Sequence, residues 1–158
     1  MTDKTFILLK PDAIERQLEP IILAFIESHG FRVVHQQSVR ASATKIVKHY
    51  EEVIRRIGAK SFKPKVLKEF VDQPIIIAVC EHPTADAVTF MRQLIGATDP
   101  LLAKKDTIRG QYGIDTLTLA RQEDRMLRNL IHASESIEDA KREINLWFDG
   151  ETCKTFYP

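Results

Sequence analysis

The sequence predicts an α/β (α+β) protein in which helices pack on one four-stranded antiparallel sheet. Short apolar runs of strand length alternate along the chain with longer segments of helical periodicity. The 158 residues allow one sizeable core and are too few for two comfortable domains. No internal repeat, low-complexity segment or Gly/Ser linker interrupts the pattern. We therefore expect residues 1–158 to form a single domain.

The first part of the chain predicts a strand, a helix and a second strand. Residues 5–9 are an apolar run of strand length. Residues 18–26 place apolar side chains at the i, i+3, i+4, i+7 and i+8 positions of an amphipathic helix, with Pro20 in its first turn and Gly30 at its end. Residues 31–39 indicate a second strand, although their alternation is imperfect.

The middle of the chain predicts two helices and a buried strand. Residues 42–57 are helical in character, and residues 65–71 form a second short helix after the breakers Gly58 and Pro64. Residues 75–80 are continuously apolar, which is typical of a strand buried on both faces.

The last part of the chain completes the order of elements. Residues 84–95 predict a helix capped by Thr84 and closed by Gly96, and a polar loop follows. Residues 130–132 end a fourth strand, and residues 137–148 form the last helix. This order of strands and helices is that of a ferredoxin-like sandwich.

Composition restricts the class of partner. The net charge is +1, from 23 basic and 22 acidic residues, so bulk electrostatics favour neither nucleic acid nor an anionic membrane as the main partner. Cys80 and Cys153 have no metal-ligand or redox spacing, and Cys80 lies in an apolar run, where it is a small buried hydrophobe. The amino terminus has no basic and apolar leader, and no apolar run approaches ~18 residues. We expect a cytoplasmic, reduced protein.

His132 is the first candidate for chemistry, because it ends an apolar strand just before the start of a helix. A neutral imidazole is a nucleophile near neutral pH, and a helix start attracts anions through its free N–H groups. Ser136 is a plausible N-cap of that helix, with Asp139 three residues on. Glu143 lies at the edge of the helix's apolar stripe and could hold one ring nitrogen of His132. A satisfied strand-end histidine and a solvated glutamate are the alternative, which the local pattern leaves open.

Phosphate binding would have to come from side chains. The chain contains neither the Gly-x-x-x-x-Gly-Lys-Ser/Thr loop nor the Gly-x-Gly-x-x-Gly turn. Polar candidates stand where elements end, namely Lys10, Arg92, Thr98 and Arg109. Arginine suits this task because its planar fork binds phosphate oxygens in bidentate fashion. Each position alone is unspecific, since most of the 23 Lys and Arg must be solvated.

Five segments resemble, in the right order, the signature blocks of nucleoside diphosphate kinases. They are residues 6–13 (FILLKPDA), 96–100 (GATDP), 107–110 (TIRG), 129–134 (NLIHAS) and 143–148 (EINLWF). The resemblance runs from Lys4 to about Phe148. It implies transfer of the terminal phosphate of a nucleoside triphosphate, typically ATP, to a nucleoside diphosphate by a ping-pong route through a phosphohistidine. It also implies Mg²⁺ bridging the phosphates, held mainly by the nucleotide and water, and a homo-oligomer, which in this family is a hexamer, a tetramer or a dimer.

The resemblance also implies the role of each site residue. His132 matches the phosphorylated histidine, and Glu143 matches the carboxylate that orients it, supported by a serine that matches Ser134. Lys10 and Asn129 match residues that contact the ribose hydroxyls, and Lys10 also reaches the phosphates. The phosphate-binding positions match Arg92, Thr98 and Arg109. Tyr50 matches the tyrosine beside the histidine. Phe62 matches the aromatic on which the base stacks, and Val66 a second apolar contact. Stacking tolerates every base, since each has a π-face.

Some positions depart from the family pattern. Gln17 and Pro20 stand near two usual glycines, and Ala133 replaces the glycine after the histidine, which demands only an ordinary backbone there. The segment before Phe62 is a few residues longer than usual. Between Gly110 and Asn129 the chain is longer by about ten residues, a length that usually forms a surface loop or an extra hairpin, for which residues 112–119 are the candidate.

Two other classes of function fit this sequence less well than a kinase. A regulatory or binding module of the same fold needs none of the chemical side chains that this chain retains. An RNA-binding module of similar topology uses exposed aromatics on the sheet and a basic face, whereas these strands are aliphatic and the net charge is near neutral.

Overall fold

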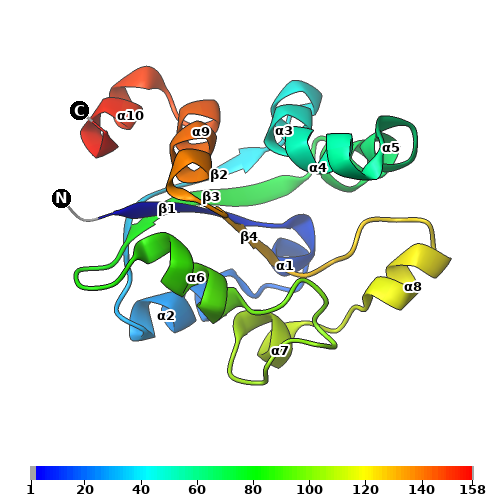
Figure 1. Ribbon diagram of the computed structural model, residues 1–158, viewed down its shortest axis with the longest axis horizontal. Helices are drawn as coiled ribbons and strands as arrows, with labels where there is room; N and C mark the ends of the chain where they lie inside the picture. The colour runs from blue at the N-terminus through cyan, green and yellow to red at the C-terminus, as the bar shows by residue number, and fades with distance from the viewer. Residues whose placement is uncertain (1–2, 158) are drawn as a thin grey trace.

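Two strands whose side chains are almost all buried form the centre of the sheet (Figure 1). β1 (Lys4–Leu9) and β3 (Pro74–Glu81) pair antiparallel, with Ile7 opposite Ala78. β2 (Arg32–Arg40) adds to β3 and β4 (Ile131–Ala133) adds to β1, both antiparallel, so the strand order is β2-β3-β1-β4. The computed structural model describes residues 3–157. The predicted four-stranded antiparallel sheet with packed helices is confirmed.

Side-chain alternation along the central strands gives the sheet two cores, one on each face (Figure 1). Ile7 and Leu9 point into the first core, and Phe6 and Leu8 into the second. The first core is covered by α1 (Pro11–Glu15), α2 (Glu19–Ser28), α6 (Ala87–Ile95) and α7 (Ile108–Tyr112). The second is covered by α3 (Ala43–His49), α4 (Glu51–Ile57), α5 (Ala59–Phe70), α9 (Ile137–Trp147) and α10 (Gly150–Phe156).

The helical segment after β2 is divided differently from the prediction. The helix expected over residues 42–57 is two helices, because Tyr50 leaves the helical conformation between α3 and α4 at φ −93° and ψ 12°. The next helix begins at Ala59 and continues through Pro64, so Pro64 is not the breaker that we expected. Gly58 is the break instead, at φ +122°, and buried Val66 and Phe70 hold the remaining turns against the core.

The predicted start of the helix after β3 is wrong for a local hydrogen-bonding reason. α6 starts at Ala87, and its N-cap is Asp86, whose Oδ1 accepts from the Thr89 amide at 3.0 Å. Thr84 does not cap it, because the His82 ring takes the amides of Thr84 and Ala85 into a preceding turn. The Ser136 N-cap is confirmed, with its Oγ 3.0 Å from the Asp139 amide.

The predicted hairpin over residues 112–119 is also wrong. This stretch holds the end of α7 and the start of α8 (Leu117–Gln122), which lies apart from the sheet in Figure 1. Thr107 and Thr116 each cap a helix by accepting a backbone N–H three residues on, at 3.1 Å in both cases. Thr107 thus starts the helix that ends at Tyr112, Thr116 starts the helix that follows, and residues 112–119 form no strand.

No helix within residues 3–157 has both the length and the apolar character needed to cross a bilayer. Cys80 is fully buried, as the sequence predicted, and burial raises the pKa of its thiol to about 12.

Two neighbouring isoleucines of α2 test the packing of the first core. Ile22 is fully buried and Ile21 is 44% exposed. We expect Ile22→Ala to lower the free energy of unfolding by about 2–5 kcal/mol, since it leaves a cavity. Ile21→Ala should change it by less than about 0.5 kcal/mol. Urea denaturation of both variants measures this difference, and equal losses would contradict the assignment of faces.

Candidate active site

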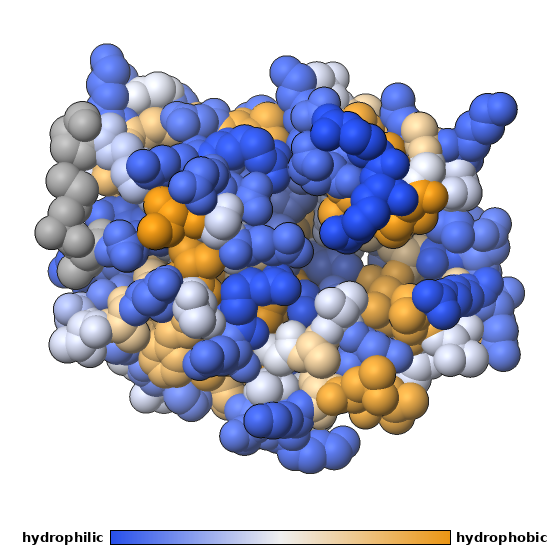
Figure 2. Space-filling model, in the orientation of Figure 1, coloured by the Kyte–Doolittle hydropathy of each residue, from blue (hydrophilic) through white to orange (hydrophobic). Residues whose placement is uncertain are grey.

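A cavity of about 420 Å³ opens beside the C-terminal ends of β1 and α6 and the N-terminal ends of β4 and α7, between α5 on one side and α8 on the other. Figure 2 shows it as a recess right of centre on this face, with strongly hydrophilic side chains at its rim. Its lining contains seven Lys and Arg side chains and one acidic side chain, Glu135. The cavity is therefore suited to an anion. Eight residues expected at the site line it: Lys10, Tyr50, Phe62, Arg92, Thr98, Arg109, Asn129 and His132.

His132 and Glu143 form the tightest polar contact of the site. His132 Nε2 lies 2.5 Å from Glu143 Oε2, and only 1% of the Glu143 side chain is exposed, against 23% for His132. The contact joins β4 to α9, whose start follows His132 after a short turn capped by Ser136. His132 Nδ1 has no hydrogen-bond partner within residues 3–157. With the carboxylate ionised, Nε2 carries the proton and the lone pair lies on Nδ1.

The surroundings keep the His132 ring neutral. Burial and the nearby guanidinium and ammonium groups of Arg109, Arg92 and Lys10 hold the pKa of His132 well below its ordinary value. Burial also raises the pKa of the Glu143 carboxyl, against the opposing effect of His49 and Arg142. The neutral ring therefore keeps a free nitrogen, Nδ1, for nucleophilic attack.

His49 is a buried neighbour that the sequence analysis missed. Its ring lies 4.4 Å from the His132 ring, centroid to centroid, and its Nδ1 accepts from the Trp147 indole N–H at 3.1 Å. An indole nitrogen only donates, so the neutral His49 ring carries its proton on Nε2. Burial and the adjacent His132 lower the pKa of His49 to about 3. His49 therefore limits the movement of the His132 ring without adding charge. The one signal in the sequence was its position next to Tyr50.

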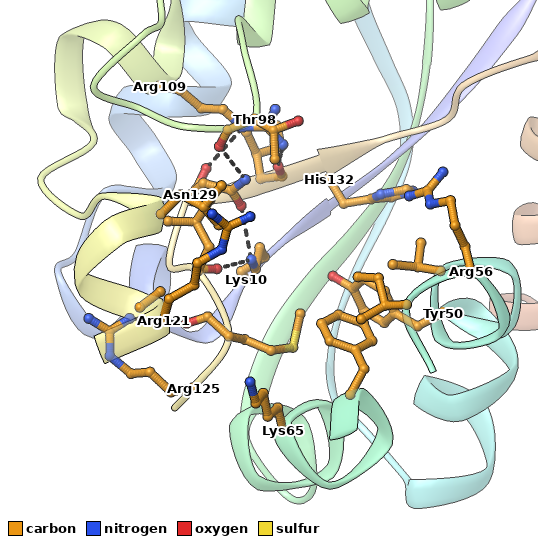
Figure 3. Close-up of a pocket in the computed structure, with 18 of the residues that line it drawn as sticks. Lys10, Tyr50, Arg56, Lys65, Thr98, Arg109, Arg121, Arg125, Asn129 and His132 are labelled. Carbon is orange, nitrogen blue, oxygen red and sulfur yellow. Dashed lines mark hydrogen bonds between the residues drawn. The ribbon is translucent and has the colours of Figure 1, made fainter. Parts of the chain in front are cut away.

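Lys10, Asn129 and Thr98 form a hydrogen-bonded chain along one wall (Figure 3). Lys10 Nζ donates to Asn129 Oδ1 at 2.9 Å and to the Leu127 carbonyl at 2.8 Å. Asn129 Nδ2 donates to the Thr98 carbonyl at 2.9 Å. Burial lowers the pKa of Lys10 to about 8, because its ammonium is almost fully removed from water.

Arg109 is held by backbone carbonyls rather than by acids. Its guanidinium donates to the carbonyls of Gly96, Asn129 and Ile131 at 3.0, 3.2 and 2.6 Å. Gly110 allows this placement, since a Cβ there would lie 1.9 Å from the Lys104 carbonyl oxygen. The charge of Arg109 is therefore oriented but not neutralised, which leaves it available to a phosphate.

Arg92 is the second arginine near His132. Arg92 Nη1 is 3.4 Å from the Ala133 carbonyl, and Nη2 is 4.0 Å from Glu135 Oε1. These are long contacts, so its side chain has freedom to adjust to a ligand.

A turn in a strained conformation presents Asn129 and His132 to the cavity. Leu130 has φ +76°, in the left-handed region that branched side chains rarely adopt. Its amide donates to buried Asp12 Oδ2 at 3.1 Å, and its carbonyl accepts from the Lys10 amide at 2.9 Å. Gln17, near a usual glycine of the family, also has a positive φ of 56°. Ala133 lies in β4 with ordinary strand geometry, as its substitution for glycine requires.

The remaining expected residues fall into two groups. Phe62 is half-buried in the cavity wall, and Tyr50 packs 6.5 Å from the His132 ring. Val66 is fully buried in the second core and is not among the cavity-lining residues, so the structure does not bring it to a ligand. The Ser134 hydroxyl bonds mainly to the Phe6 backbone, at 3.1 Å from its nitrogen and 3.3 Å from its oxygen, and also lowers the pKa of Glu143.

Comparison with known proteins agrees with this geometry. The family model "Nucleoside diphosphate kinase" matches residues 3–153. The chain belongs to the nucleoside diphosphate kinase family. The nucleoside diphosphate kinase of Synechocystis sp. is 38% identical over 94% of this chain and 89% of that protein. The nucleoside diphosphate kinase of Saccharomyces cerevisiae is 37% identical over 95% and 88%.

Solved structures of the family superpose well on this kinase. A nucleoside-diphosphate kinase from Borrelia burgdorferi, described as a transition-state mimic with bound vanadate and ADP, has a TM-score of 0.87, with 28% identity over 95% of this chain and 89% of that one. An NDP kinase from Pyrobaculum aerophilum has a TM-score of 0.85, with 30% identity over 96% and 98%. This enzyme therefore transfers a terminal phosphate from a nucleoside triphosphate to a nucleoside diphosphate, by the family's ping-pong mechanism through a phosphohistidine.

The low pKa of Lys10 predicts a pH dependence. Lys10 is charged below pH 8 and loses its charge above, so phosphate attraction weakens as pH rises through about 8. We expect kcat/KM for phosphorylation of the free enzyme by ATP to fall about tenfold between pH 7 and pH 9. Adenine has no titration in this range. Lys10→Gln should be slower at pH 7 and flat across the range. An identical alkaline decline in both proteins would contradict the assignment to Lys10.

Proposed function

We propose that His132 is the residue that carries the phosphoryl group, through Nδ1. The observation that supports this most is that only one of the two ring nitrogens of His132 has a hydrogen-bond partner in the described chain. Nε2 is fixed by Glu143 at 2.5 Å, while Nδ1 is unpartnered within the described chain. Figure 3 shows the His132 side chain beside the same open space as Lys10, Tyr50 and Arg56. A nucleophile held in one orientation beside fixed cations is what phosphoryl transfer requires.

The proposed first half-reaction conserves atoms and charge within this site. The Nδ1 lone pair forms a bond to the γ-phosphorus, and the bond from that phosphorus to the β-phosphate oxygen breaks with its electron pair leaving on the diphosphate. The ring then carries PO₃ on Nδ1 and a proton on Nε2. The Glu143 carboxylate stabilises this ring through the contact that it already makes in the free enzyme. The second half-reaction is the reverse with another diphosphate.

In the proposal the cations act on the phosphates, where charge develops. After burial, the charges of Arg109 and Arg92 are the largest influences that lower the pKa of His132, so both guanidinium groups act on the space around this ring. Arg92, Thr98 and Arg109 contact phosphate oxygens in this proposal. Lys10 and Asn129 contact the ribose hydroxyls, and Lys10 also contacts the phosphates. Fixed donors of this kind need no reorganisation during the transfer.

The base lies on Phe62 in this proposal, and Tyr50 and Ser134 support the histidine. Phe62 is the half-buried aromatic ring of the cavity wall. Tyr50 packs beside His132, and Ser134 ties β4 to β1 next to it. Val66 contributes from behind the wall through the core on which α5 packs.

We further propose that Mg²⁺ accompanies the nucleotide. The cavity lining offers one carboxylate side chain, Glu135, and no set of oxygen ligands for a protein-bound ion. This donor set fits an ion held mainly by phosphate oxygens and water. Mg²⁺ would supply charge neutralisation of the phosphates.

A cytoplasmic homo-oligomer is the remaining part of the proposal. Leu101, Leu102 and Ile114 are 69%, 75% and 76% exposed, which is costly for large apolar side chains unless a second copy covers them. The two cysteines are free and buried, as in a reducing compartment. Light scattering should give a mass that is a multiple of 18.1 kDa, and a mass of 18.1 kDa itself would contradict the oligomer.

The decisive experiment labels the intermediate. The wild-type protein mixed with γ-labelled ATP and no acceptor should gain an acid-labile adduct, which ADP then removes. We expect His132→Ala to form no adduct and to lose at least about 10³-fold in turnover, while nucleotide binding persists. His29→Ala is the control, because His29 is an exposed histidine outside the cavity lining, and it should behave as wild type. Near-normal turnover by His132→Ala would end the proposal.

A further inference from the structure

The segment between Gly110 and Asn129, which is longer than the family pattern, forms one wall of the nucleotide cavity. It contributes Leu117, Ala120, Arg121, Arg125, Met126 and Leu127 to the lining. In Figure 1, α8 and the chain that follows it lie opposite α5. The insertion is therefore part of the cavity and not a remote surface loop.

Two ion pairs join the C-terminal half of this wall to α5. Asp124, just after α8, lies 2.8 Å from Lys65 of α5, and Arg128 lies 3.0 Å from Glu69 of the same helix. Within the wall, Asp115 accepts from Arg125 at 2.7 and 3.0 Å. Asp115 also accepts the Arg128 amide at 2.9 Å. The side chains of the wall are thus presented from a defined backbone.

Arg121 differs from the other basic side chains on this side of the cavity. The guanidinium of Arg125 is taken by Asp115 and Glu123, and the ammonium of Lys65 by Asp124. The Arg121 side chain has no hydrogen bond or ion pair with any residue between 3 and 157. Figure 3 shows it extending from α8 across the cavity toward Lys10 and Asn129.

We propose that Arg121 is a further nucleotide-binding residue of this kinase, and that its guanidinium binds phosphate oxygens of the bound nucleotide. The proposal rests on the proposed function, because it places the nucleotide in this cavity. A guanidinium that lines a cavity rich in cations, without an acidic partner among the described residues, is stabilised by a bound anion. Arg109 already donates to three backbone carbonyls, so part of its hydrogen-bonding capacity is used within the protein. Arg121 would add N–H donors that no described residue uses.

The test is the affinity of the unphosphorylated enzyme for ADP, measured by calorimetry. We expect Arg121→Gln to weaken ADP binding about tenfold, the effect of one charge-assisted contact. The difference from wild type should shrink as salt is raised. Arg121→Lys should keep part of the affinity as a point charge. Arg55→Gln is the matched control, since it removes the same charge from an exposed side chain of α4 outside the cavity lining.

Competition by adenosine separates phosphate contacts from base and sugar contacts. Arg121→Gln should leave adenosine inhibition unchanged, because adenosine has no phosphate. ADP affinity within twofold of wild type, or equal loss for ADP and adenosine, would overturn the proposal. Labelling with γ-labelled ATP at saturation should still modify Arg121→Gln fully. A wild-type protein that never takes label would instead refute the proposed function, and the ADP titration would still report on Arg121.

Discussion

The contact between the His132 imidazole and the buried Glu143 carboxylate is the interaction on which the site depends. A carboxylate that is 1% exposed is costly to ionise unless a donor meets it, and His132 Nε2 is the donor at 2.5 Å. The contact works only because β4 and α9 are joined by a short turn with a defined helix start at Ser136. Because the buried carboxylate needs a hydrogen-bond donor, Nε2 is held at Glu143 and Nδ1 is the imidazole nitrogen left to face a substrate.

A second constraint is the excess of basic side chains around the cavity. The described structure keeps Arg109 and Lys10 in place with backbone carbonyls and one amide, so their charges are oriented without being cancelled. Neutral acceptors cost the site less attraction for a phosphate than carboxylates would. At the cavity wall formed by the segment between Gly110 and Asn129, the basic groups are neutralised instead. Lys65, Arg125 and Arg128 each form an ion pair with a carboxylate. Arg121 is the basic side chain of that wall left outside this network.

Much of this arrangement could be predicted from the sequence, and the exceptions have physical causes. Apolar runs fixed the strands, because residues 5–9 and 75–80 have few alternatives to burial. Five ordered motifs were enough for the family and contain five of the predicted cavity residues, while Tyr50, Phe62 and Arg92 lie outside the motifs and were placed by their resemblance to the family. The break at Gly58 was predicted, but the break at Tyr50 and the cap at Asp86 were harder, since they depend on a backbone angle and a single hydrogen bond that composition does not reveal. The hairpin expected near Tyr112 failed for the same reason, and His49 was missed because its contacts are tertiary.

The left-handed turn at Leu130 links the durability of the fold to the speed of the reaction. Its unfavourable backbone angle is sustained by the Asp12 carboxylate and by neighbouring Lys10 and Arg109, which bond to the same short stretch. A glycine there would relax the backbone angle but would also remove a side chain that is fully buried in the first core. Leu130 therefore couples the packing of the core to the placement of Asn129 and His132 on either side of it.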